Sequence, residues 1–172
     1  MKVILWMGMS LNGMIARDNN EEDFISHNTW LEWLKAVNKS GCLVWGRKTH
    51  QIVKTWPKEY FDDIKKFRKI IVTTNTEYQV NKEFSLAKSP QQAIEILSRE
   101  GFETLVITGG SELNTSFARE GLIDEVILNV EPVIIGKGIP LFNFQDFDLK
   151  LKLITMVKVT DNLIQLHYTV RN

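Results

Sequence analysis

The chain has 172 residues, enough for one domain with a sizeable core, and its 44% hydrophobic and 24% charged residues argue against a disordered protein. Its 21 basic and 21 acidic residues cancel, so the net charge gives no reason to expect binding to nucleic acid or to an anionic membrane. The single cysteine, Cys42, cannot form an internal disulfide, and its apolar surroundings predict a buried, unreactive thiol. The three histidines lack the spacing of metal ligands, so we expect no metal site.

The N-terminal segment is apolar, and residues 3–9 predict a buried strand. This segment is too short for a signal peptide or a membrane span, so we expect a cytoplasmic protein. Residues 10–13 are typical of a turn, and residues 14–16 form a short apolar return that can frame a pocket. A polar loop, residues 17–23, follows.

Apolar residues at helical spacing predict a first helix that ends at Gly41. Asn28 or Thr29 could cap its N-terminus. We expect Trp33 to pack in the core, and Trp30 is the better candidate for a pocket wall.

A buried strand, residues 42–45, runs into Gly46-Arg47-Lys48-Thr49 and then into a helix that extends to about Lys54. The N-terminus of a helix presents free backbone N–H groups that attract phosphate, and an arginine can add two parallel hydrogen bonds. The alternative is a solvated basic helix start, which is less favourable because cations oppose the helix dipole.

A second junction of the same kind joins a strand, residues 104–108, to a helix over residues 112–120. Gly109-Gly110 separates the two, and glycines allow another backbone or a ligand to approach closely. From this stretch alone, a phosphate site and a simple tight corner both remain open.

The remaining elements follow the same alternation of strand and helix. Residues 69–73 predict a strand that ends in a cluster of hydroxyl and amide side chains. Ser89 can cap the next helix with Pro90 at its first position, and Gly101 ends that helix. Four strands with helices between them predict an open α/β sheet with largely parallel strands.

The pattern changes in the C-terminal part of the chain. Residues 123–130 predict a strand, and Gly136-Lys137-Gly138 is typical of a flexible turn. Residues 149–159 and 163–170 predict a hairpin around Asp161-Asn162, with no helix between them. The chain is therefore expected to form one α/β domain over residues 1–172, with antiparallel strands at one edge of its sheet.

Five stretches, in this order, resemble the dihydrofolate reductase superfamily, and in particular the stand-alone reductase domains of the riboflavin-biosynthesis type. The likeness covers nearly the whole chain and implies a dihydrofolate-reductase-like fold. The stretches are residues 10–16, 46–49, 72–74, 106–113, and 122–126 with 131–138.

The resemblance implies NADPH as the cofactor. Gly8 and the apolar residues 14–16 would line the nicotinamide, and the two glycine-ended junctions would hold the phosphates. The hydroxyls of Thr73 and Thr74 would lie beside the adenosine. The implied cofactor-binding residues are Gly8, Ile15, Ala16, Gly46, Arg47, Lys48, Thr49, Thr73, Thr74, Thr108, Gly109, Gly110, Ser111, Glu112 and Leu113.

The substrate side departs from both relatives. Dihydrofolate reductases carry an acidic residue on the first helix, and Trp30 stands at that position here. Riboflavin-type domains usually have an aspartate at the position of Asn12, and they have an Asp-Asn-Pro segment that is absent from residues 51–56. The implied substrate-binding residues are Trp6, Ser10, Asn12, Trp30 and Asn129.

The sequence therefore predicts an NADPH-dependent reductase that transfers a hydride to a C=N or C=O bond of a small heterocyclic or sugar-derived substrate. Glu131 is the best carboxylate candidate for the proton donor, with ordered water as one alternative and a surface position before a proline turn as another. A non-catalytic NADPH-binding protein that lost the catalytic acid, or a purely structural module, is the alternative function. The resemblance also implies a homodimer.

Overall fold

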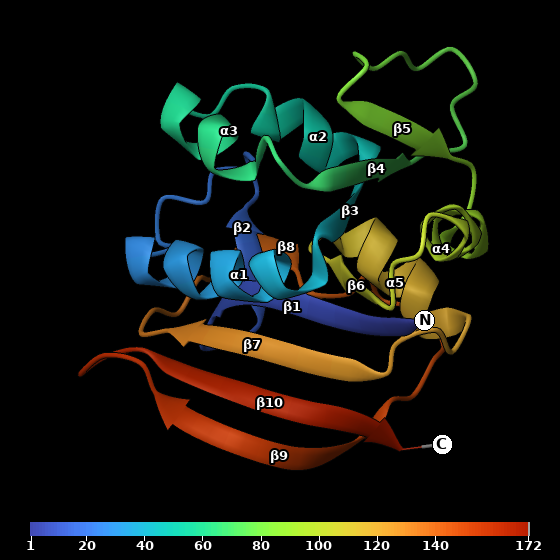
Figure 1. The fold of residues 1–172 in the computed structure, drawn as a ribbon. Helices are drawn as coiled ribbons and strands as arrows, with labels where there is room; N and C mark the ends of the chain where they lie inside the picture. The colour runs from blue at the N-terminus through green and yellow to red at the C-terminus, as the bar shows by residue number, and fades with distance from the viewer. Residues whose placement is uncertain (172) are drawn as a thin grey trace.

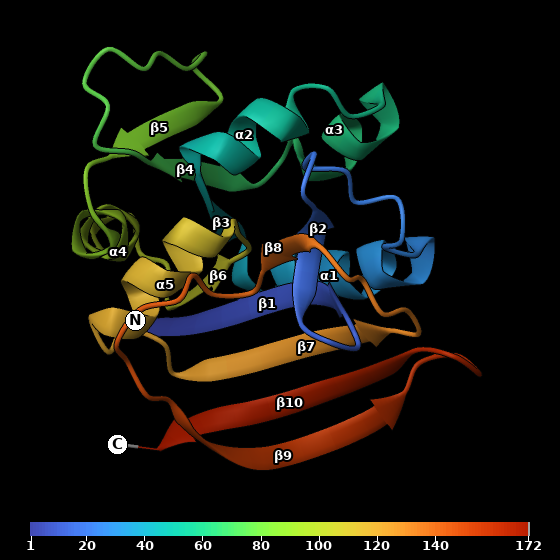
Figure 2. The same cartoon turned by 180° about the vertical axis from the view of Figure 1, so that it is seen from behind.

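The computed structural model describes residues 1–171, which form ten strands and five helices. Helices lie on both faces of a central eight-stranded sheet (Figures 1 and 2). The strands are β1 (Lys2–Ser10), β2 (Met14–Arg17), β3 (Cys42–Gly46), β4 (Arg68–Val72), β5 (Phe84–Ala87), β6 (Thr104–Ile107), β7 (Glu125–Glu131), β8 (Gly138–Pro140), β9 (Lys150–Lys158) and β10 (Ile164–Arg171). The helices are α1 (His27–Ser40), α2 (Arg47–Val53), α3 (Lys58–Ile64), α4 (Pro90–Arg99) and α5 (Ser111–Arg119).

The strand order in the central sheet is β5-β4-β3-β6-β1-β7-β10-β9. All neighbours from β5 to β7 are parallel, whereas β10 is antiparallel to both β7 and β9. The predicted α/β class and the antiparallel C-terminal hairpin are therefore confirmed. The carboxyl ends of these short parallel strands lie together along one side of the sheet, and open α/β folds bind ligands at that side.

The inner parallel strands β1, β3, β4 and β6 are largely buried on both faces, as their continuous apolar sequences predict. Along β1, Val3, Leu5 and Met7 pack with α4 and α5 residues into one cluster, whereas Trp6 points to the opposite face. Trp6 packs there with Trp33 of α1 and with neighbours from β3 and β4. Successive residues thus serve two cores, because side chains alternate across a strand.

The first helix begins earlier than predicted. Its N-cap is Ser26, whose hydroxyl accepts a hydrogen bond from the Thr29 backbone N–H at 3.3 Å, so neither Asn28 nor Thr29 is the cap. Gly41 ends the helix in the left-handed conformation with φ of 74°, as predicted. Ser89 and Pro90 also start α4 in the predicted arrangement.

Two short strands were not predicted. β5 adds a parallel edge next to β4, and β8 pairs with β2 in a separate two-stranded sheet. Gly138 lies in β8 rather than in a flexible turn. A Cβ at Gly138 would lie 2.5 Å from the carbonyl oxygen of Ala16, so only glycine lets the two strands approach this closely.

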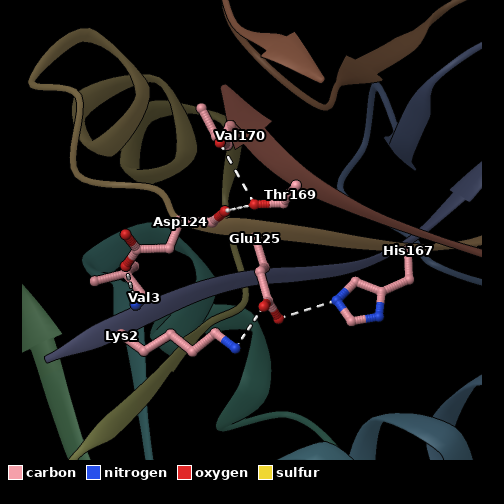
Figure 3. A network of polar contacts seen from close by, with 7 residues as sticks. All are labelled: Lys2, Val3, Asp124, Glu125, His167, Thr169 and Val170. Atoms are coloured by element: carbon pink, nitrogen blue, oxygen red, sulfur yellow. Dashed lines mark hydrogen bonds and ion pairs between the residues drawn. The ribbon is translucent and has the colours of Figure 1, made fainter. Parts of the chain in front are cut away.

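A network of polar contacts connects the antiparallel hairpin to the parallel part of the sheet (Figure 3). Glu125 on β7 pairs with Lys2 of β1, and its Oε2 lies 2.9 Å from Nε2 of His167 on β10. The neighbouring Asp124 accepts a hydrogen bond from the Val3 backbone N–H at 2.7 Å. Burial alone would raise the pKa of Glu125, but hydrogen bonds from Lys2 and His167 outweigh that effect and lower it.

Replacing Glu125 by glutamine should therefore destabilise the protein in a pH-dependent way. The folded pKa lies below the ordinary 4.5, so the contribution is fully present above that value and is lost as the pH falls through the folded pKa. We expect Glu125→Gln to lower the free energy of unfolding by about 1–2 kcal/mol at neutral pH and by less in acid. Chemical denaturation at both pH values, with the exposed Glu120→Gln as control, measures this. An equal loss at both pH values would contradict the assignment.

Candidate functional site

Two neighbouring cavities lie at the carboxyl ends of the parallel strands. The first, of about 340 Å³, is the tryptophan cavity, lined chiefly by Trp6, Trp30, Trp33, Trp45, Trp56 and Tyr60. The second, of about 460 Å³, is the helix-end cleft, lined by the first residues of α2 and α5 and by the ends of β2 and β4. Ile15, Glu22 and Thr49 line both cavities and mark their junction.

The helix-end cleft brings together most of the residues expected to bind a cofactor. Gly8 and Thr108 line the tryptophan cavity instead, and Gly109 lines neither cavity. The predicted residues in the cleft are Ile15, Ala16, Gly46, Arg47, Lys48, Thr49, Thr73, Thr74, Gly110, Ser111, Glu112 and Leu113.

The two glycine-ended junctions touch each other. The Gly46 backbone N–H donates to the Gly109 carbonyl oxygen at 2.9 Å, and the Gly109–Gly110 peptide bond is cis. Gly109 has φ of 93°, a conformation that favours glycine. A Cβ at Gly110 would lie 3.0 Å from the Thr49 hydroxyl oxygen. The positive φ of Gly109 and the limited space at Gly110 therefore favour glycine in this turn, and the Gly46–Gly109 hydrogen bond holds the N-termini of α2 and α5 side by side.

The helix-end cleft is suited to an anion. Within the described chain, no side chain caps α2 or α5, so the first backbone N–H groups of both helices remain available to a ligand. Lys48 pairs with Glu112 at 2.5 Å, which neutralises its charge locally. Arg47 bonds only to the neutral Gln51, at 3.2 Å, among the described residues, and therefore keeps its positive charge for a ligand.

The tryptophan cavity contains all five tryptophans of the chain. Trp30 is at the centre of the aromatic group, with its ring centroid 4.7 Å from those of Trp33 and Tyr60 and 5.6 Å from that of Trp56. Its indole N–H donates to Asp63 of α3 at 3.0 Å. Trp30 thus forms a cavity wall as predicted, and Trp33, which is only 4% exposed, packs in the core as predicted while its ring reaches the same cavity.

Three of the expected substrate residues lie outside both cavities and have structural partners. The Ser10 hydroxyl donates to Asn12 Oδ1 at 2.8 Å, and Asn12 in turn bonds to both backbone groups of Ile135. Asn129 accepts from Gln165 at 2.9 Å and donates to Thr29 at 3.2 Å. These hydrogen bonds fix the turn after β1 and the packing of α1 on β7.

Glu131 is 3% exposed, so the alternative of a surface residue before a proline turn is wrong. One carboxylate oxygen accepts three hydrogen bonds, from the Ser26 backbone N–H at 2.9 Å, the Ser26 hydroxyl at 2.8 Å and the Thr29 hydroxyl at 2.6 Å. A carboxylate beside a helix N-terminus is stabilising because it complements the helix dipole. Glu131 lines neither cavity, and its contacts make it an anchor for α1.

Glu22 is the carboxylate that sequence reasoning missed. It lies in the polar loop between β2 and α1, and it lines both cavities at their junction. Glu22 is exposed as a whole residue, and desolvation of its carboxyl group by the surrounding protein raises the pKa of Glu22 from 4.5 to about 7. Nothing distinguishes it in the sequence, because acidic residues at 21, 22 and 23 all suit a solvated loop.

No helix within residues 1–171 is long and apolar enough to cross a membrane. No group of three or more histidine, cysteine, aspartate or glutamate side chains in the same range could hold a metal ion. Cys42 is buried as predicted, and burial raises its pKa to about 12.

The strand order, the paired glycine junctions and the two cavities define an α/β protein with a dihydrofolate-reductase-like fold. The chain belongs to the RibD C-terminal domain family, whose model matches residues 1–165. The predicted family is therefore confirmed.

Similar proteins agree with this assignment. The uncharacterized protein YwjB of Bacillus subtilis (strain 168) is 29% identical over 174 residues, which cover 97% of each chain. A protein provisionally assigned to riboflavin biosynthesis in Shewanella sp. PV-4 superposes with a TM-score of 0.80 at 24% identity over 100% of both chains. The dihydrofolate reductase of Enterococcus faecalis, in complex with NADP(H) and RAB-propyl, superposes with a TM-score of 0.73 at 19% identity over 99% of this chain and 97% of its own.

The contacts of Glu131 predict that Glu131→Gln loses stability. The variant replaces the carboxylate that accepts three hydrogen bonds with a neutral amide, so these hydrogen bonds lose their charged acceptor. We therefore expect the free energy of unfolding to fall by about 1–3 kcal/mol. Denaturant titration beside the exposed control Glu77→Gln measures the loss. A variant that kept full stability but lost activity would instead identify Glu131 as the proton donor.

Proposed function

We propose that this protein is an NADPH-dependent reductase that transfers a hydride to a C=N or C=O bond of a small heterocyclic substrate. The observation that carries the proposal is the junction of two unlike cavities. One provides helix N-termini and Arg47 for phosphates, and the other provides aromatic walls for a planar acceptor. The NADP(H) complex of the similarly folded Enterococcus faecalis enzyme supports the choice of cofactor.

The residues of the helix-end cleft fit NADPH. The backbone N–H groups at the start of α2 and α5 would bind the pyrophosphate, and Arg47 with Thr73 and Thr74 would bind the adenosine 2′-phosphate. NADPH supplies the hydride when it is bound. The protein aligns the reacting groups at the junction, where Ile15 and the tryptophan rings exclude water.

The tryptophan cavity favours a heterocyclic acceptor over a sugar phosphate. Among the described residues that line it, none is a lysine or arginine, so His27 is the one side chain there that could carry a positive charge to balance a phosphate group. Its rings offer faces and edges on which a planar ring can stack. We therefore propose heterocycles without a phosphate group, rather than ribose phosphates, as the hydride acceptors.

A non-catalytic NADPH-binding protein is the second candidate, because Trp30 occupies the helix position at which dihydrofolate reductases carry their acid. An indole cannot donate a proton to the substrate as a carboxyl group does. Titration with NADPH, followed by tryptophan quenching, tests cofactor binding. Loss of nicotinamide absorbance with a panel of folates, pyrimidine ribose phosphates and cyclic imines tests turnover. Binding without turnover would favour the second candidate, and no binding would exclude both.

Replacing Arg47 should weaken NADPH more than NADH. Arg47→Ala removes the cation proposed to bind the 2′-phosphate, which NADH lacks, so we expect the Kd for NADPH to rise by about 10- to 100-fold. The Kd for NADH should change little. Fluorescence titration of both cofactors measures this, with exposed Arg99→Ala as control. An equal rise in Kd for both cofactors would contradict the assignment of Arg47 to the 2′-phosphate site.

We also propose that the protein forms a homodimer through β9. In the described chain this strand pairs only with β10, and Figures 1 and 2 show it at the edge of the sheet beyond the helices. An edge strand with free N–H and C=O groups can pair with a second copy of itself. Its exposed apolar side chains are Leu151, Leu153, Ile154, Met156 and Val157.

Light scattering tests the dimer. The wild type should have twice the chain mass of 19.9 kDa, and Met156→Lys should shift it towards one chain mass, because a charge would be buried at the interface. Leu11→Lys, at an apolar residue that is 62% exposed outside β9, should leave the dimer intact. A wild type with a single chain mass would refute the proposal.

A further inference from the structure

We infer that Glu22 is the proton donor of this site, delivering a proton to the nitrogen of a C=N bond held in the tryptophan cavity. This assignment rests on the proposed reductase function and adds the acid that the sequence does not identify. Glu22 is one of three residues that line both cavities, and of these three only Glu22 can release a proton near neutral pH.

The position of Glu22 is the first argument. A hydride acceptor in the tryptophan cavity must meet a nicotinamide at the junction with the helix-end cleft, and Glu22 lines both cavities at that junction. The other carboxylates of this region have different tasks. Glu131 accepts three hydrogen bonds at the start of α1, and Asp63 accepts the indole N–H of Trp30.

The protonation state is the second argument. A general acid works best when its pKa is near the operating pH, and burial raises the pKa of Glu22 to about 7. The neighbouring Asp23 is different because Arg17 holds it in a two-point ion pair, and this hydrogen bonding lowers the pKa of Asp23. Since Glu22 also reaches the surface, its carboxylate can regain a proton from water after each turnover.

The other titratable or charged side chains of this site line one of the two cavities or belong to the same loop as Glu22. The tryptophan cavity contributes His27 and Tyr60, and the helix-end cleft contributes Arg47 and the Lys48–Glu112 pair. Glu21 is its neighbour in the loop. The closest matched control is therefore Glu21→Gln, which makes the same chemical change one residue away outside both cavities.

The proposed step balances. The acceptor carbon gains the hydride that bound NADPH supplies, the π electron pair of the C=N bond forms a new N–H bond with the Glu22 proton, and the products are the amine, NADP⁺ and the Glu22 carboxylate. An acceptor whose nitrogen is already alkylated and positively charged needs no proton. It therefore separates proton donation from every other contribution of Glu22.

The test compares 3,4-dihydroisoquinoline, a neutral cyclic imine, with its N-methyl iminium salt. Glu22→Gln should slow reduction of the imine by about 100-fold or more, the usual contribution of a general acid, and should slow reduction of the iminium salt by less than about threefold. Glu21→Gln should affect neither. Equal slowing of both acceptors, or of neither, would overturn the assignment.

A second readout needs no turnover. A carboxylate beside the nicotinamide favours the positively charged NADP⁺ over NADPH, so the ratio of Kd for NADPH to Kd for NADP⁺ should rise severalfold as the pH passes through about 7. This rise should be absent in Glu22→Gln. A flat ratio in the wild type would overturn the role of Glu22. If the ratio rises but the wild type reduces neither acceptor, the proposed reductase activity on C=N bonds fails, and Glu22 as proton donor fails with it.

Discussion

The site depends on the contact between two glycine-ended strands. β3 and β6 are hydrogen-bonded neighbours, so their ends lie together, and the Gly46 N–H to Gly109 carbonyl bond continues that pairing into the turns. Gly109 has a positive φ of 93° that favours glycine, and a Cβ at Gly110 would crowd the Thr49 hydroxyl oxygen at 3.0 Å. Because the contact is backbone to backbone, two helices start from one point and present their N–H groups to one cleft.

Three carboxylates in this region differ in their surroundings. Glu131 is buried and saturated by donors, so it holds α1 in place. Asp63 is exposed and orients the Trp30 indole. Glu22 lines both cavities at their junction, where desolvation raises its pKa. Carboxyl groups in one region thus take different roles because their hydrogen-bond partners and their surroundings differ.

Much of this arrangement could be predicted from local sequence. Glycine at 46, 109 and 110 after apolar strands indicates the cleft, because a strand-to-helix turn of that kind is a local event. The tryptophan cavity is assembled from β1, α1, β3, α3 and a loop, and its shape follows from tertiary packing that periodicity does not reveal. Glu22 was missed for the same reason. The pairing of β8 with β2 was also missed, since a three-residue strand at Gly138 looks like a turn.

The central claim is that the two cavities form one site, with the nicotinamide at their junction. A crystal structure of the protein with NADPH tests this most directly. The account predicts the phosphates against Arg47 and the start of α5, with the nicotinamide between Ile15, Glu22 and Thr49 and its reactive face towards the tryptophan cavity. An adenine in the tryptophan cavity, or a nicotinamide ordered outside both cavities, would contradict it.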